Sequence, residues 1–433
     1  MSSFHQAFIH RFLRPMQVGW FLANRQIRRS SKWTTILIVF IMVLTFLNLV
    51  VVSGLLVGLL TGSFEQFRKN YSGDILITPR PGREYIEESP QVLAYLKADP
   101  NIAAFSARYS SLATVRGSLS ENAPGKEKAN QAGGAIVGID PVVEERLTGF
   151  SKFIIKGEML KPGDDNYILI GANLIKEYSS FADVDIPGLE LLKKVSVGDK
   201  VRATFNSPKG EPVTKEYVIK GLVKSKVDQI SQRMFVVDSG LRRILTANEW
   251  EVQEIAINAK PNAQTAALTS IKTFMGDRLN RVQTSAEAIP AFLRDVEQTF
   301  NILGNALSSI ALVVASITIF IVIFINAVTR RKFIGIMKGI GIEPRAIQFA
   351  YVFQALFYGI TGSIMGLIIT FGFLKPYFDA NPIDFPFSDG VLAATASGSA
   401  IRVGILLVVT LLAGFIPATL IVRRNTLDSI LGR

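Results

Sequence analysis

The sequence contains no cysteine and only two histidines, His5 and His10. Thiolate and imidazole are the side chains that hold zinc and iron–sulfur clusters, so centres of these kinds and thiol chemistry are excluded. Charge is missing from four long stretches, which carry no Asp, Glu, Lys, Arg or His. They lie between Lys32 and Glu65, between Gln298 and Arg330, between Arg345 and Lys375, and between Arg402 and Arg423.

Each uncharged stretch is long enough to cross a membrane. About 20 apolar residues in a helix span the ~30 Å hydrocarbon layer of a bilayer. We therefore predict four transmembrane helices, at Thr34–Leu60, Phe300–Val328, Ala346–Leu374 and Val403–Val422. Buried helices of a water-soluble protein are the alternative, and four such helices without a single charge make it the weaker one. A mean hydropathy of +0.32 argues in the same direction.

Positive charge is concentrated in three short segments, at residues 1–33, 329–345 and 423–433. Together they carry 14 Lys and Arg against two acids, Glu343 and Asp428, which accounts for the net charge of +12. Residues 61–300 carry 31 cations and 30 anions. Short loops rich in Lys and Arg stay in the cytoplasm, so we expect these three segments inside. A neutral domain of 240 residues outside does not favour nucleic-acid binding.

These patterns predict a membrane α-helical protein with a large α+β extracytoplasmic domain inserted between helices 1 and 2. The predicted segments are 1–33 (cytoplasmic amphipathic arm), 34–60 (first span), 61–299 (extracytoplasmic α+β domain with helical stalk), 300–328 (second span), 329–345 (cytoplasmic loop), 346–374 (third span), 375–402 (short extracytoplasmic loop), 403–422 (fourth span) and 423–433 (cytoplasmic tail). In the arm, Phe4, Phe8 and Phe12 recur at helical spacing, which favours a helix lying in the headgroup layer over a disordered leader.

The inserted domain has two similar ends. Strand–helix–strand patterns occur at 74–78, 89–98 and 102–116, with Ser89 and Pro90 as helix start, and again at 254–259, 261–276 and 279–284, with Pro261 as helix start. We interpret them as a pseudo-repeated subdomain close to the membrane. The region between them predicts a mainly β subdomain, with strands at 135–139, 167–170, 200–205, 217–223 and 234–237.

Aromatic and aliphatic stripes continue the first two spans beyond the lipid. Their residues are Phe64, Phe67 and Tyr71 after the first span and Phe292, Val296 and Phe300 before the second. Their helical spacing predicts amphipathic helices that pair as a two-helix stalk. The alternative is that each helix packs independently on the core of the inserted domain.

Several chemistries are missing. No span carries a titratable residue of the kind that ion-driven transporters use, which disfavours a self-powered antiporter. The only Gly-Lys pair, Gly125-Lys126, lacks the glycine and hydroxyl residues of a phosphate-binding loop. Asp164 and Asp165 lack the further oxygen ligands of a calcium loop. The inserted domain holds no clustered nucleophile and base. Energised work would therefore need energy from a partner.

Small residues recur at four-residue spacing in the spans, which lets helices approach closely in lipid. The predicted packing positions are Gly54, Gly58, Gly362, Gly366, Gly414 and Ala418.

The loop between the second and third spans combines cations with apolar residues. Arg330, Arg331, Lys332 and Lys338 flank Ile336, Met337 and Ile340, and Gly341 follows as a helix end. Exposed apolar side chains beside cations would form a docking surface for a protein. Ordinary anchoring of a positive loop at the membrane surface is an equally good interpretation.

This loop resembles the corresponding segment of FtsX-like ABC transporter permeases, of the macrolide-exporter and lipoprotein-release type. Further similarity to the family lies at Gly138–Pro141, Ile168–Ala172, Val197–Val201, Ile219–Val223, Gly414–Ala418 and Arg423–Leu431. Two positions depart from the family pattern: Phe333 stands where the family usually has Glu, and Asn425-Thr426 replaces a residue-Pro pair.

The resemblance implies a permease subunit that couples ATP hydrolysis by a separate cytoplasmic ATPase to motion of its periplasmic core domain. The loop at 330–347 would be the coupling helix, and the work would be export or release of a substrate by mechanotransmission. The chain itself would bind no cofactor and have no ATPase site. Expected partners are the ATPase, a second permease subunit, membrane lipid and, in some systems, a periplasmic adaptor and an outer-membrane channel, with the chain in the inner membrane. The alternative function is an extracytoplasmic signalling or scaffold protein that regulates cell-wall enzymes.

Overall fold

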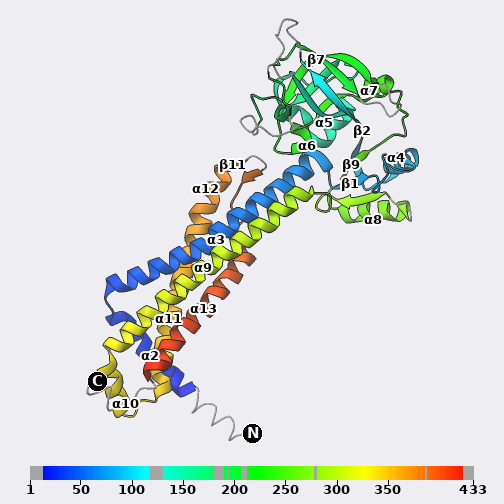
Figure 1. Ribbon diagram of the computed structural model, residues 1–433. Coiled ribbons are helices and arrows are strands. Elements are labelled where there is room, and N and C mark those ends of the chain that lie inside the picture. Colours follow the sequence, from blue (N-terminus) through cyan, green and yellow to red (C-terminus); the bar gives the residue numbers. More distant parts are fainter. Residues whose placement is uncertain are drawn as a thin grey trace. The chain divides into compact units, whose positions relative to one another are not determined.

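Figure 1 shows the computed structural model of the 433-residue chain. The structure describes residues 13–117, 130–179, 190–193, 195–205, 212–276, 280–385 and 388–422. Two compact units form. The membrane unit comprises Met1–Leu60, Asp295–Asp384 and Asp389–Arg433, and the inserted domain comprises Thr61–Arg294 and Phe385–Ser388.

Long helices build the membrane unit (Figure 1). Their bounds are α2 Arg14–Arg29, α3 Lys32–Phe67, α9 Ala291–Thr329, α10 Arg331–Gly339, α11 Pro344–Ile369, α12 Lys375–Ala380 and α13 Ala396–Val422. A π-helical stretch, Thr370–Leu374, connects α11 to α12. Among the described residues, four helical segments are long and apolar enough to cross a membrane, as the sequence predicted. They extend beyond the apolar runs, because backbone hydrogen bonding continues where the side chains become polar.

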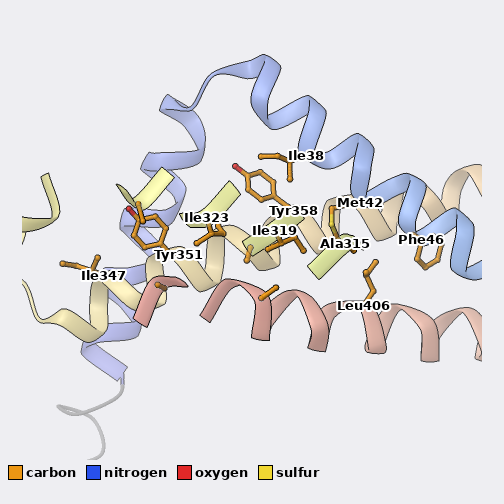
Figure 2. Close-up of a cluster of buried hydrophobic side chains, with 14 of the residues drawn as sticks. Ile38, Met42, Phe46, Ala315, Ile319, Ile323, Ile347, Tyr351, Tyr358 and Leu406 are labelled. Carbon is orange, nitrogen blue, oxygen red and sulfur yellow. The ribbon is translucent and has the colours of Figure 1, made fainter. Parts of the chain in front are cut away.

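The core of the membrane unit is a ladder of side chains four residues apart (Figure 2). Ile38, Met42 and Phe46 of α3 are buried, and so are Ala315, Ile319 and Ile323 of α9. Rows of residues at i and i+4 form the ridges by which helices commonly pack. Ile347, Tyr351 and Tyr358 of α11 and Leu406 of α13 complete the labelled cluster.

The N-terminal segment is described from Leu13 onward. Phe4, Phe8 and Phe12 lie outside the described residues. The described part, α2, packs against α11, and a Cβ on Gly19 would lie 2.6 Å from the Cβ of Phe349. One face of α2 thus packs against another helix, whereas Trp20 and Phe21 remain exposed.

The inserted domain is built on one extended sheet with the strand order β10-β1-β9-β2-β3-β8-β5-β7-β4, and β6 pairs with β2 and β7. The strands are β1 Ile75–Thr78, β2 Ile102–Arg116, β3 Gln131–Ile139, β4 Ile154–Gly157, β5 Tyr167–Gly171, β6 Lys200–Phe205, β7 Val213–Val223, β8 Met234–Val237, β9 Glu254–Ala259 and β10 Arg281–Thr284. Strand β2 joins the two halves: its first residues pair with β9 and its last with β3 and β6.

The predicted strand–helix–strand pairs interleave in this sheet. β1 and β2 are joined by α4 (Ser89–Ala98), and β9 and β10 by α8 (Gln264–Met275). The antiparallel order β10-β1-β9-β2 is that of a ferredoxin-like split unit. Tyr95 of α4 stacks on Phe274 of α8 with 4.0 Å between ring centroids. The repeat predicted from the sequence thus forms a single sheet, in which strands of the two halves alternate.

Two helix starts differ from the prediction. The Ser89 hydroxyl donates to the carbonyl of Trp250 and does not cap α4. The second helix begins at Gln264 and not at Pro261, because Asn262 adopts a positive φ of 62° in the turn between them. All five strands expected in the middle of the domain are present. β4 and the helices α5 (Pro141–Thr148), α6 (Asp228–Ser231) and α7 (Asp238–Leu245) were not predicted.

The segment between α12 and α13 holds a small antiparallel element, β11 (Ile383–Phe385) with β12 (Ser388–Gly390).

Candidate functional site

The loop between α9 and α11 forms the short helix α10. Gly341, with a φ of 91°, ends the segment in a conformation that favours glycine, and Pro344 starts α11. Ile334 is buried in the cluster of the membrane unit. Phe333, Ile336 and Ile340 are 68%, 51% and 74% exposed. The helix therefore has one face inserted among the membrane helices and one apolar face uncovered.

The predicted members of this site are divided between these two faces. Ile336 and Ile340 are exposed, whereas Met337 is half-buried against the membrane cluster and is not part of the uncovered face. Phe333 takes its place, a residue that sequence reasoning treated only as a departure from the family pattern. The helical spacing of 333, 336 and 340 is the signal that identifies it.

The cations of α10 do not all point the same way. Arg330 and Arg331 are half-buried, and Lys332 is exposed. Lys338 donates to the backbone carbonyl of Val422, at the end of α13. Burial lowers the pKa of Lys338. Lys338 thus connects α10 to α13 through a hydrogen bond.

The small residues of the spans lie at close contacts. A Cβ on Gly362 would lie 2.5 Å from the Cβ of Met42, and one on Gly366 would lie 2.3 Å from Cδ1 of Phe46. These two glycines of α11 let α3 approach closely. A Cβ on Gly414 of α13 would lie 2.6 Å from the Cβ of Ala355 of α11. Ala418, also in α13, is fully buried.

Gly54 and Gly58 of α3 contact a chain segment and not a helix. The backbone N–H of Ala393 donates to the carbonyl of Gly54 at 3.0 Å. A Cβ on Gly58 would overlap the carbonyl oxygen of Val391. The two glycines therefore admit the backbone of residues 391–393 against α3.

The first predicted stalk stripe packs into the inserted domain. Phe67 and Tyr71 are buried in a hydrophobic cluster with residues such as Phe150 and Phe235, and Phe64 lies against its edge. This packing corresponds to the alternative stated above, packing on the domain's own core. Val296 and Phe300 of α9 are half-buried, and the side chain of Phe292 lies outside the described residues.

Tyr71 also belongs to a buried ionic network. Its hydroxyl donates to Oε2 of Glu254 at 2.5 Å, and its backbone carbonyl accepts from Arg108 at 3.0 Å. The Arg108 guanidinium contacts Oε1 of Glu144 at 2.6 Å and Oε1 of Glu254 at 2.7 Å. Arg233 donates to the Tyr71 hydroxyl. The network joins the end of the helical segment that follows α3 to β2, α5 and β9.

Charge complementarity keeps this network ionised. Burial acts against the charge of Arg108, but Glu144 and Glu254 outweigh it and raise the pKa of Arg108. Burial likewise acts against the charge of Glu254, but Arg108 and Arg233 outweigh it and lower the pKa of Glu254. A buried ion pair of this geometry is costly to break, because the remaining partner is left without compensation.

Sequence reasoning missed the network. Its members are 21 to 183 residues apart, so no local motif contains them. One signal was available: Arg108 interrupts the apolar and small residues of a long predicted strand, where an unpaired charge would be unfavourable. Its partners could not be named without the sheet register.

Within the described ranges, no cluster of three or more His, Asp or Glu side chains is placed to hold a metal ion.

Comparisons with known proteins identify part of the chain. Residues 305–426 match the model of the FtsX-like permease C-terminal family. An uncharacterised ABC transporter permease of Methanocaldococcus jannaschii, MJ1507, is 23% identical over 182 residues, which cover 41% of this chain and 43% of that protein. The ABC transporter permease YtrF of Bacillus subtilis is 30% identical over 133 residues, which cover 31% of this chain and 28% of that protein. The chain thus spans less than half the length of these relatives.

Two solved structures are similar to about half of the chain. The periplasmic region of MacB from Actinobacillus actinomycetemcomitans is 13% identical, with a TM-score of 0.34, and the match covers 51% of this chain and 93% of that one. The extracellular domain of the noncanonic ABC-type transporter YknZ from Gram-positive bacteria is 12% identical, with a TM-score of 0.30. The match covers 48% of this chain and 99% of that one. The resemblance expected from the sequence is confirmed for residues 305–426, which match the FtsX-like permease C-terminal family.

Proposed function

We propose that this chain is the permease subunit of an ABC transporter in which a separate ATPase drives motion of the inserted domain for export or release of a substrate. The ATPase docks on α10, at Phe333, Ile336 and Ile340 with the neighbouring cations. The observation that carries the proposal is the uncovered apolar face of α10, a helix that directly connects two membrane helices. Exposed apolar patches edged by polar residues mark protein interaction sites.

Three attachments make α10 suited to passing on a movement. Ile334 and Met337 pack into the cluster that includes α3, α9, α11 and α13. Lys338 holds the carbonyl of Val422. Because packed interiors transmit displacement and compress little, a shift of α10 would move these helices together.

At the other end of α3, the Tyr71 network is suited to receiving the movement. Tyr71 follows α3 in a continuous helical segment and contacts Arg108 and Glu254, which lie on neighbouring strands. Arg108 lies in the part of β2 that pairs with β9, and the same strand continues into pairing with β3. A force on Tyr71 would thus reach both halves of the sheet.

The remaining partners follow from the same proposal. Two permease subunits assemble around the ATPase dimer, in the inner membrane and with α10 and both termini in the cytoplasm. The outward face of α9 fits lipid or a second subunit, since it exposes apolar side chains such as Ile310, Ile317 and Ile321. In envelopes with two membranes, an adaptor and an outer channel would complete the path.

The test uses the full chain purified from its native membranes with its bound partners. We expect Ile336→Asp with Ile340→Asp to abolish co-purified, vanadate-sensitive ATP hydrolysis while the chain still inserts in the membrane. Met337→Asp is unsuitable, because Met337 packs in the helix cluster and its loss would also destabilise the fold.

The matched control is Leu112→Asp, an equally exposed apolar residue in the inserted domain. It should retain hydrolysis. Wild-type hydrolysis and export in the Ile336/Ile340 variant would contradict the coupling role of α10. Wild-type membranes that yield no nucleotide hydrolase at all would favour the signalling or scaffold function instead.

A further inference from the structure

A cavity of about 540 Å³ lies within the membrane unit, between α2, α10 and α11. Three arginines line it: Arg25 and Arg29, one turn apart on α2, and Arg330 at the start of α10. No acidic residue is among the lining side chains. The cavity therefore concentrates positive charge from two segments that are 300 residues apart in the sequence.

The three arginines are available for a ligand. Over the part of the chain that the structure describes, none of them forms an ion pair or a side-chain hydrogen bond. By contrast, the buried Arg108 is paired with Glu144 and Glu254. Guanidinium groups bind carboxylates and phosphates in forked geometry, so an unpaired set of three fits an anion.

Tyr351 supplies a second, independent observation. This residue of α11, labelled in Figure 2, is part of the buried cluster of the membrane unit. It also lines the same cavity and is only 1% exposed. Its hydroxyl has no hydrogen-bond partner. A buried hydroxyl without a partner is unfavourable, and buried tyrosines almost always find one. The orphaned hydroxyl is explained if an acceptor oxygen from a ligand occupies the cavity.

The other walls are apolar. Leu22 of α2 and Phe333, Ile334 and Met337 of α10 line the cavity beside the arginines. The site lies at the end of the membrane helices, since α10 directly follows α9 and Tyr351 is about two turns into α11. Charge together with apolar walls, at the level of a membrane boundary, matches a molecule with an anionic head and a hydrocarbon chain. Basic pockets between membrane helices are typical sites for such headgroups.

We propose that this cavity binds an anionic phospholipid. Arg25, Arg29 and Arg330 hold the phosphate, Tyr351 donates to one of its oxygens, and an acyl chain lies along Phe333 and Met337. The lipid bridges α2 to α10 and so fixes the helix at which a driving subunit would dock. This binding is a property of the membrane unit alone and does not depend on the identity of that subunit.

The test measures lipid binding to the full chain in mild detergent by native mass spectrometry, with phosphatidylglycerol and with phosphatidylcholine as probes. The variant Arg25→Gln, Arg29→Gln, Arg330→Gln removes the three cavity cations. Each cation near an anionic headgroup contributes roughly a fivefold gain in affinity, so we expect phosphatidylglycerol binding to fall by at least about tenfold. Phosphatidylcholine binding should be unchanged, and Tyr351→Phe should weaken phosphatidylglycerol binding by about threefold.

The control variant, Arg14→Gln, Arg28→Gln, Arg345→Gln, removes the same charge from exposed positions outside the cavity. It should bind phosphatidylglycerol within about twofold of the wild type. Equal losses in both triple variants would overturn the site, because only bulk charge would then matter. Displacement of the lipid by inorganic phosphate in large excess would overturn it in favour of a free anion. A change of oligomeric state in the cavity variant, with unchanged lipid binding, would overturn it in favour of a second copy.

Discussion

The two units of this protein differ in the side chains that form their close contacts. In the membrane unit, helices approach through glycines, with Gly362 and Gly366 placed against Met42 and Phe46. In the inserted domain, buried contacts are also ionic, with Arg108 between Glu144 and Glu254. Between helices in lipid, apolar burial gives little driving force, so shape decides which helices associate. In a water-exposed domain, apolar burial stabilises the fold and a few polar contacts can fix a single arrangement.

The largest expected effect concerns the buried ionic network of the inserted domain. Arg108→Met should destabilise the protein by about 3 to 5 kcal/mol, because it leaves Glu144 buried without its cation and leaves Glu254 with Arg233 alone. The measurement is thermal unfolding of the full chain in detergent, followed by loss of near-ultraviolet circular dichroism. The control Arg202→Met removes an exposed pair with Glu216 and should change stability by less than about 1 kcal/mol. Equal effects would show that burial of the Arg108 network contributes nothing special.

An intermediate effect tests the close approach of helices in the membrane unit. Gly366→Ala places a methyl group against the Phe46 ring and should cost about 1 to 3 kcal/mol through overpacking. Gly404→Ala, in α13, adds the same methyl group where no atom lies within 4 Å. It should be neutral or stabilising by about 0.5 to 1 kcal/mol, since alanine favours helix more than glycine does. Unfolding midpoints in the same detergent compare the two, and a harmless Gly366→Ala would remove the case for close helix approach.

The smallest expected effect is the pH dependence of the inserted domain. Glu254 has a lowered pKa in the folded protein. A carboxylate of this kind stabilises the fold above its unfolded pKa, about 4.3, and the contribution is lost as the pH falls through the lower folded value. We expect the unfolding midpoint of the wild type to fall as the pH drops below the unfolded pKa of about 4.3. Glu254→Gln should show a shallower fall, and identical slopes would contradict the assignment.

The sequence predicted the structure of the membrane unit more completely than that of the inserted domain, because membrane helices depend on local sequence and strand pairing does not. Four uncharged runs predicted four membrane helices, because a bilayer imposes one length and one polarity on any segment that crosses it. The strands of the inserted domain were also predictable, since local alternation and turn residues mark them. The order β10-β1-β9-β2 was not, because pairing between strands almost 200 residues apart leaves no local pattern.

The same division holds for the candidate sites. The loop at 330–347 stood out in the sequence by its cations and apolar residues, and its position between two spans is fixed by the chain itself. Which of its side chains are uncovered was decided by packing: Met337 turns toward the helix cluster, and Phe333 does not. The cavity with Arg25, Arg29 and Arg330 exists only because α2 folds back against α11.

The sequence by itself determined that this chain crosses a membrane, where its charges are concentrated, and where its membrane helices and most of its strands lie. These properties follow from solvation and local geometry, which act on neighbouring residues. Tertiary structure alone decided that Tyr71 meets Arg108 and Glu254, and that three arginines share a cavity with an unpartnered hydroxyl. Such contacts depend on the free energy of packing whole elements together, and no stretch of the sequence contains that information on its own.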